Sequence, residues 1–147
     1  MTTLDSPRTR RTALLTATAA LALLAACSAS DPLAGLGGPG LAERCAAGLP
    51  QPEGTVDHAC NDGQGRTQYP LPLEPGSYDL VALCDGADDL HVVLNPAQPL
   101  FETATAVCDE GSDPTRVPIG TIGDATTVRV AMSQLGEGDT AWFIVRR

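Results

Sequence analysis

Thr126-Thr127-Val128-Arg129-Val130-Ala131-Met132 is the segment with the clearest two-residue periodicity in this chain of 147 residues. Val128, Val130 and Met132 fall on one face of an extended backbone, and Arg129 falls on the other. Successive side chains of a β-strand point to opposite faces of a sheet. The segment therefore predicts a strand with one buried face and one face in water.

Five more strand-like segments accompany this one, at residues 78–84, 90–94, 101–108, 116–119 and 140–146. Turn signals at Asp85-Gly86 and Asn95-Pro96 separate them, and Pro118 suits an edge strand. No helix-length pattern of period 3.6 follows residue 26. Six short strands separated by turns predict an all-β fold, a small β-sandwich.

Cys84 and Cys108 end the first and third of these strands. In a flat three-stranded meander, the two strands would lie about 9.6 Å apart, whereas a disulfide needs Cα atoms roughly 5.5 Å apart. A Cys84–Cys108 bond would therefore put the two strands on facing sheets or make them direct neighbours.

The other cysteines are Cys27, Cys45 and Cys60. With Cys27 set aside, three pairings of the remaining four are possible, and we favour Cys45–Cys60 with Cys84–Cys108 because each closes a short loop. Zinc is the competing interpretation, but it usually needs closely spaced ligand pairs such as Cys-x-x-Cys. Successive cysteines are separated here by 14, 23 and 23 residues.

The N-terminus has the three parts of a secretory signal. Arg8, Arg10 and Arg11 precede an apolar run at residues 13–26, which ends in small residues. That run is too short for a membrane-spanning helix, which needs roughly 20 apolar residues. The segment Thr9-Arg10-Arg11-Thr12-Ala13-Leu14 loosely resembles a twin-arginine export signal, so the sequence leaves the export route open.

Leu24-Ala25-Ala26-Cys27 resembles the lipobox of bacterial lipoproteins. The resemblance implies diacylglycerol attached to Cys27 through a thioether and cleavage before this residue. The expected location is the extracytoplasmic face of the cell membrane, with the lipid as anchor. An ordinary cleaved signal followed by a chance cysteine is the alternative.

These features divide the chain into a signal peptide (1–26), a lipidated cysteine with a flexible linker (27–44) and a β-sandwich domain (45–147). The linker is expected because residues 35–40 are rich in Gly and Pro. Residues 45–75 are expected to be irregular, because frequent Pro and Gly disfavour long helices and central strands.

The charge of the processed chain disfavours nucleic-acid binding, and the absence of lysine excludes two kinds of chemistry. Removing residues 1–26 takes away three arginines and Asp5, so nine basic and eighteen acidic residues become six and seventeen, a net charge of −11. A strongly acidic surface repels phosphate backbones, which disfavours nucleic-acid binding. The sequence contains no lysine, which excludes Schiff-base and P-loop chemistry.

The candidate site residues are few. If the Cys84–Cys108 disulfide forms, acidic turns gather at one end of the sandwich and offer oxygen ligands for Ca²⁺. The residues of these turns are Asp85, Asp88, Asp89, Asp109, Glu110 and Asp113. We nevertheless expect these turns to be solvated loops that bind no metal. His58 and His91 are the only histidines, and Ser77, Ser112 and Ser133 lie in no Gly-x-Ser-x-Gly elbow. Trp142 and Phe143 are consecutive and should face opposite sides of the last strand.

The sequence thus predicts no catalytic site and no cofactor. It favours a lipid-anchored, non-enzymatic module that binds a protein or glycan of the envelope. Two alternatives remain: an accessory subunit whose acidic surface meets a basic partner in a membrane assembly, and a Ca²⁺-dependent module.

Overall fold

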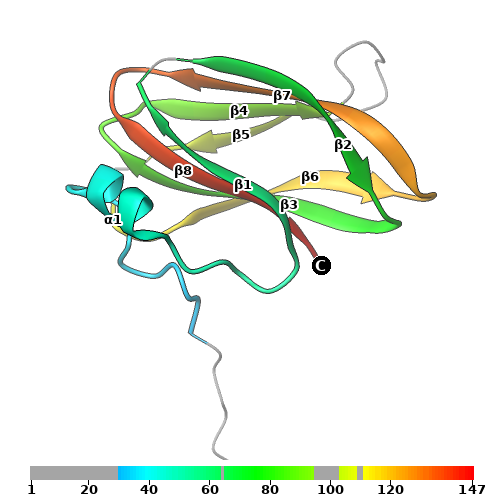
Figure 1. The fold of residues 1–147 in the computed structure, drawn as a ribbon, viewed down its shortest axis with the longest axis horizontal. Helices are drawn as coiled ribbons and strands as arrows, with labels where there is room; N and C mark the ends of the chain where they lie inside the picture. Colours follow the sequence, from blue (N-terminus) through cyan, green and yellow to red (C-terminus); the bar gives the residue numbers. More distant parts are fainter. Residues whose placement is uncertain (1–29, 64, 95–102, 109–110) are drawn as a thin grey trace, which may run out of the picture.

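The protein is a sandwich of two antiparallel four-stranded sheets (Figure 1). The structure is a computed structural model, and it describes residues 30–147 except 64, 95–102 and 109–110. Sheet A has the order β1-β8-β3-β6, and sheet B has the order β2-β7-β4-β5. The strands are β1 (Thr55–Asp62), β2 (Arg66–Leu73), β3 (Gly76–Asp85), β4 (Asp89–Leu94), β5 (Thr103–Val107), β6 (Thr115–Ile122), β7 (Thr126–Leu135) and β8 (Asp139–Arg146). One short helix, α1 (Leu41–Ala47), precedes them. The predicted all-β sandwich is confirmed.

All six predicted strands are present, with ends shifted by a few residues. The expectation that residues 45–75 are irregular was wrong, because this stretch contains β1 and β2. Both are edge strands, one in each sheet. An edge strand tolerates proline because one of its sides needs no N–H donors, and Pro70 and Pro72 are exposed positions of β2. The exclusion of central strands from this stretch therefore holds.

The main core lies between the two sheets. Alternate residues of β7 point inward, and Val128, Val130 and Met132 are each at most 1% exposed. Trp142 of β8 faces the same core, and its neighbour Phe143 faces the other side of sheet A. Both aromatic side chains are buried, so neither offers an exposed contact for a ligand.

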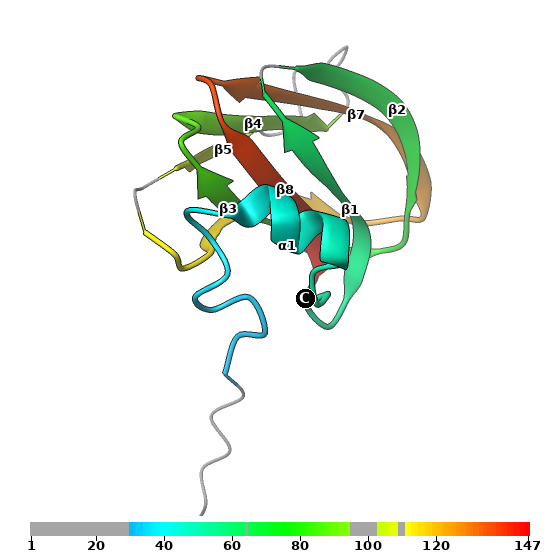
Figure 2. The ribbon, with the colours of Figure 1, turned by 60° about the vertical axis from the view of Figure 1, so that its left-hand side comes forward.

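A second apolar cluster covers the outer face of sheet A. It joins Phe143 and its outward-facing neighbours in β3 and β8 to Leu33 and Leu41, which are both 0% exposed. We call residues 31–49, which include α1, the cover segment (Figure 2). The flexible linker expected up to residue 44 is thus corrected from Asp31 onward, because its leucines bury against the sheet and its Gly-rich turn makes specific hydrogen bonds.

Arg44 of α1 is the centre of those hydrogen bonds. Its guanidinium donates to the carbonyl oxygens of Leu36, Gly37, Gly38 and Pro39 at distances of 2.8–3.1 Å. Two of these residues also bond to the sandwich, since the Gly37 N–H donates to the Ser112 carbonyl (2.7 Å) and the Gly38 N–H to the Cys84 carbonyl (2.8 Å). The turn is therefore ordered by one side chain and by the sheet beneath it.

The two disulfides have the pairing that the sequence favoured. Cys84 of β3 in sheet A bonds to Cys108, directly after β5 of sheet B, with Cα atoms 5.6 Å apart. The two strands thus lie on facing sheets, one of the two arrangements that the distance argument allowed. Cys45 bonds to Cys60 and links α1 to β1, with a Cα separation of 6.2 Å.

Candidate functional site

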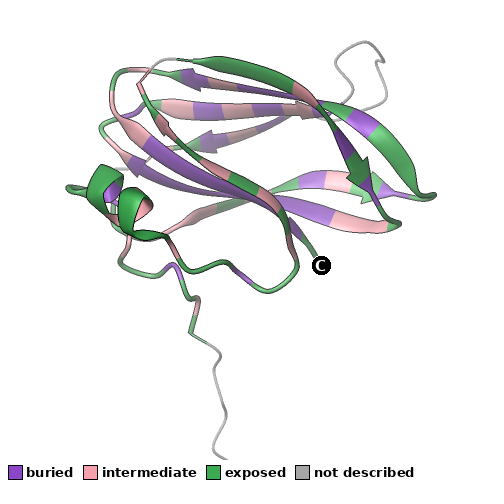
Figure 3. Cartoon of the chain, viewed as in Figure 1, coloured by how far each residue is buried: buried purple, intermediate pink, exposed green. Residues whose placement is uncertain are grey.

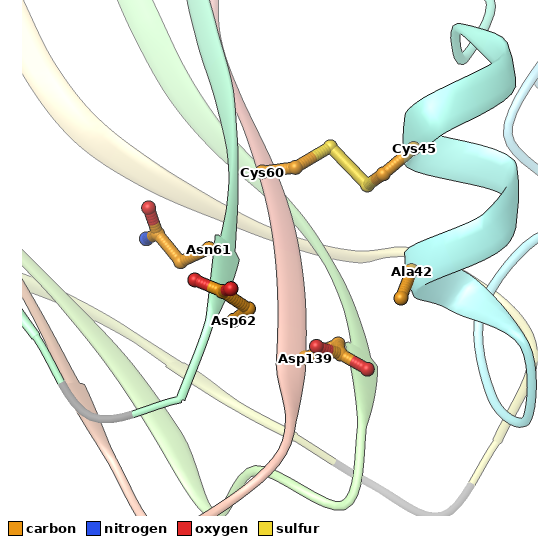
Figure 4. A pocket seen from close by; sticks show the side chains of 6 residues that line it. All are labelled: Ala42, Cys45, Cys60, Asn61, Asp62 and Asp139. Carbon is orange, nitrogen blue, oxygen red and sulfur yellow. A yellow bond between two sulfur atoms is a disulfide. The ribbon is translucent and has the colours of Figure 1, made fainter.

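Two pockets flank the Cys45–Cys60 disulfide, where α1 crosses β1. Figure 4 shows the bond running from strand to helix beside one of them. Their volumes are about 320 Å³ and 350 Å³, which is close to the lower limit for small-molecule sites. Each is large enough for one side chain or one sugar-sized group.

The first pocket is acidic. Asp62 of β1 and Asp139 of β8 line it together with Ala42 and Asn61. Asp62 is the register partner of Asp139, and Asp139 is in turn the partner of Asp85 in β3, so three carboxylates form one row across sheet A. Like charges directly opposite each other across strands repel. The row is therefore an electrostatic cost to the fold and a local centre of negative charge.

The second pocket has no acidic residue in its lining. Phe143 and Leu49 line it, and the imidazole of His58 stacks on the Phe143 ring with centroids 5.9 Å apart and planes 5° from parallel. His58 Nε2 also lies 3.0 Å from Nε2 of Gln51. His58 is exposed at an edge strand, and its contacts join Gln51, two residues after the cover segment, to Phe143 of sheet A.

The outer face of sheet B has no covering layer among the described residues. Its rows are set by the strand register: Leu135, Asp89 and Val107 form one row, and Ser133, His91 and Thr105 form the next. Leu135 is 49% exposed and Val107 55% exposed, which makes them the most exposed of the large hydrophobic residues that the structure describes. The two sheets are thus unlike on their outer faces (Figure 3).

His91 belongs to that outer face. Its Nδ1 lies 2.8 Å from the Thr105 hydroxyl oxygen. Ser133 is its register partner on β7, yet within the described part of the chain no hydrogen bond joins the two side chains. The Ser77 hydroxyl pairs with that of Thr121 at 3.0 Å, and Ser112 is exposed. The described residues therefore assemble no serine–histidine pair.

A side-chain hydrogen bond joins the β1 edge of sheet A to the β2 edge of sheet B. The Tyr69 hydroxyl of β2 donates to Asp57 of β1. Burial of the Tyr69 ring, followed by the hydrogen bond and the charge of Asp57, raises the pKa of this phenol well above its usual value. The phenol therefore stays protonated and keeps the two edge strands together.

Among the acidic residues named as possible Ca²⁺ ligands, three that the structure describes lie in different surroundings. Asp85 belongs to the row on sheet A, Asp89 lies on the outer face of sheet B, and Asp113 accepts a hydrogen bond from the Gly35 N–H. Across the described ranges, no cluster of three or more His, Cys, Asp or Glu residues is arranged to hold a metal ion. Asp109 and Glu110 lie outside these ranges, as do Cys27 and the rest of the lipobox.

Sequence reasoning missed the row of Asp62, Asp85 and Asp139. Each residue stands at a turn, but only the strand register brings the three together.

No helix among the described residues is long and apolar enough to cross a bilayer.

Comparisons with known proteins add little to this description. No family model matches the chain. No curated protein matches it either. Among solved structures, the chain is similar to a carbohydrate-binding module, TmCBM61, in complex with β-1,4-galactotriose. The match has 12% sequence identity and a TM-score of 0.43, and covers 69% of this chain and 77% of that one.

Proposed function

We propose that this protein is an extracytoplasmic lipoprotein, anchored by Cys27, whose sandwich binds a protein of the cell envelope without catalysing a reaction. The observation that carries the binding role is the difference between the two sheets. The outer face of sheet A is covered by the protein's own cover segment, whereas none of the described residues covers the outer face of sheet B, which exposes Leu135 and Val107. Leu135 and Val107 stand in one row on either side of Asp89, so two apolar contacts and a carboxylate are offered together on this face.

A protein partner fits this face better than a glycan does. Sugar-binding surfaces commonly use exposed aromatic rings, and within the described residues Tyr78, Trp142 and Phe143 are buried and Tyr69 is held by Asp57. The four strands of sheet B have 8, 10, 6 and 5 residues and give a face of roughly 470 Å², somewhat more than half of the area that each partner contributes to a standard interface. The partner would therefore also contact the loops around the face.

The anchor is supported by the cysteine pairing. The two disulfides use Cys45, Cys60, Cys84 and Cys108. Cys27 is then the single cysteine without a disulfide partner, and it stands at the lipobox position. A chain secreted into an oxidising compartment rarely keeps a free reactive thiol, and lipidation removes this one.

The anchor is tested by the intact mass of protein extracted from membranes, for the wild type and for Cys27→Ser. We expect the wild type to begin at residue 27 and to carry the mass of a diacylglycerol and its thioether. We expect the variant to lack that mass and to leave the membrane fraction. A wild-type protein with an unmodified thiol at position 27 would exclude the anchor.

The binding face is tested by affinity recovery from detergent extracts with Leu135→Arg and Val107→Arg, and with Ala46→Arg on α1 as the matched control. A partner on sheet B should be lost from both face variants and kept by the control. Equal recovery with all three would show that sheet B is not the binding face. Stoichiometric recovery of one membrane protein would identify the role as that of an accessory subunit.

A further inference from the structure

We infer that the cover segment lies against the lipid headgroups of the membrane and that the outer face of sheet B is thereby presented away from it. This inference rests on the proposed anchor at Cys27. It assigns a second interaction surface, whose partner is a lipid bilayer, to the side of the molecule opposite the proposed protein-binding face.

The first argument is the length of chain between the lipid and the fold. Because Asp31 and Leu33 are already held against sheet A, only four peptide steps separate Cys27 from a residue that contacts the sandwich. Fully extended, they span about 14 Å. The Asp31 carboxylate lies 3.6 Å from the guanidinium of Arg116, which also reaches Asp79 of β3 at 3.6 Å, so this end of the chain is attached to sheet A.

The second argument is the position of that attachment. In both views the first described residues lie beside sheet A and α1, on the side away from β7 and β4 (Figures 1 and 2). The two sheets of a sandwich are about 10 Å apart, and the cover segment adds a further layer. Turning sheet B toward the bilayer would lift Asp31 by about 20 Å and require the chain to pass round the rim of the sandwich. Four residues are too few for that path.

The third argument is charge. Glu43 is the one charged residue among the exposed positions of residues 30–51, although the processed chain carries a net charge of −11. The other exposed positions there are small or uncharged: Ser30, Pro32, Ala34, Gly35, Pro39, Gly40, Ala42, Ala46, Ala47, Gly48, Pro50 and Gln51. Anionic headgroups repel carboxylates, so with Glu43 as its one fully exposed charge this surface meets little repulsion.

The cationic groups nearest to the tether agree with this orientation. The side chains of Arg116 and Arg147 are 41% and 55% exposed, and both contact Asp79. The carboxylate row of Asp62, Asp85 and Asp139 lies beside Ala42 of α1, at the other end of sheet A from Asp79, since β3 runs from Asp79 near its start to Asp85 at its end. The end of the sheet that carries the tether is therefore the less acidic one.

The test uses the full lipidated protein in vesicles of phosphatidylcholine and phosphatidylglycerol in equal amounts, in which a fraction of the phosphatidylcholine headgroups carry a nitroxide quencher. Tryptophan is introduced at one of two exposed positions, as Ala46→Trp on α1 or as Thr127→Trp on the outer face of sheet B. Buried Trp142 contributes the same background to both. We expect the nitroxide to reduce the emission of the Ala46→Trp protein at least twofold more than that of the Thr127→Trp protein.

Equal quenching at the two positions, or stronger quenching at position 127, would overturn the inference. Failure of the wild-type protein to float with the vesicles would overturn the anchor instead, so the two failures are distinguishable. Ala47→Trp replaces Ala46→Trp if the latter does not fold. Twelve Gly and Ser residues inserted between Ser30 and Asp31 should reduce the difference between the positions, and an unchanged difference would show that tether length does not set the orientation.

Discussion

At the scale of single residues, the contact between Tyr69 and Asp57 does most to join the open edges of the two sheets. β1 and β2 are each hydrogen-bonded to one neighbour only, β8 and β7 respectively. The phenol of one edge strand donates to the carboxylate of the other, and burial together with the Asp57 charge disfavours the phenolate. The bond therefore depends on a proton that Tyr69 holds more tightly in the folded state than in the unfolded chain.

This contact predicts a loss of stability in alkali. Because the folded-state pKa of Tyr69 lies above its unfolded value of about 10, the stabilisation is complete below that pH and is lost as the pH rises above it. The free energy of unfolding, measured by urea titration from pH 8 to 11, should fall more steeply for the wild type than for Tyr69→Phe. Parallel slopes for the two proteins would show that this phenol is not perturbed by the fold.

At the scale of elements, the cover segment shows how a sequence rich in Gly and Pro becomes ordered. Such a composition cannot order itself, but this segment contributes Leu33 and Leu41 to a cluster on sheet A. Arg44 then satisfies four backbone carbonyls that a tight turn would otherwise leave to water. The planar guanidinium presents several donors in a fixed arrangement, whereas a lysine ammonium has the charge without that geometry.

Removal of this side chain should loosen the segment. Hydrogen bonds from a charged donor contribute about 1.5–3 kcal/mol each when well formed, and partial exposure lowers this, so we expect Arg44→Ala to reduce the free energy of unfolding by about 1–3 kcal/mol. Arg44→Lys should recover only part of the loss. An Arg44→Ala protein with wild-type stability and wild-type amide protection at Gly37 and Gly38 would contradict the assigned role.

At the scale of the whole molecule, the two disulfides hold different parts together. Cys84–Cys108 connects the sheets and has one nearly buried partner, since Cys84 is 7% exposed. Cys45–Cys60 connects the cover segment to sheet A, and pockets lie on both sides of it. A thiolate must approach the disulfide along the S–S axis, so access favours attack at the second bond.

Graded reduction should therefore proceed in order. With increasing dithiothreitol under native conditions, alkylation followed by peptide mass analysis should label Cys45 and Cys60 before Cys84 and Cys108. The once-reduced protein should keep its sandwich, because Leu33, Leu41 and Arg44 still hold the cover segment. Simultaneous labelling of all four cysteines would mean that the bonds are equally accessible or that the protein unfolds globally as soon as the first bond opens.

The sequence by itself determined the local features. Two-residue alternation predicted the strand containing Val128, Val130 and Met132, adjacency placed Trp142 and Phe143 on opposite faces, and spacing favoured the disulfides that the structure contains. These features depend on neighbouring residues and on the fixed geometry of an extended chain. The lipobox is likewise recognised from four consecutive residues that end at Cys27, and the lipid anchor stays a prediction.

Only the tertiary structure decided which faces are covered. The apolar residues of the cover segment lie too far apart in the sequence to form a pattern, and they become a layer because sheet A offers Phe143 and its neighbours as a second apolar surface. The row of Asp62, Asp85 and Asp139 likewise exists only in the register of β1, β8 and β3. Burial and charge are properties of surfaces that distant segments make together, and a chain read one residue at a time does not contain them.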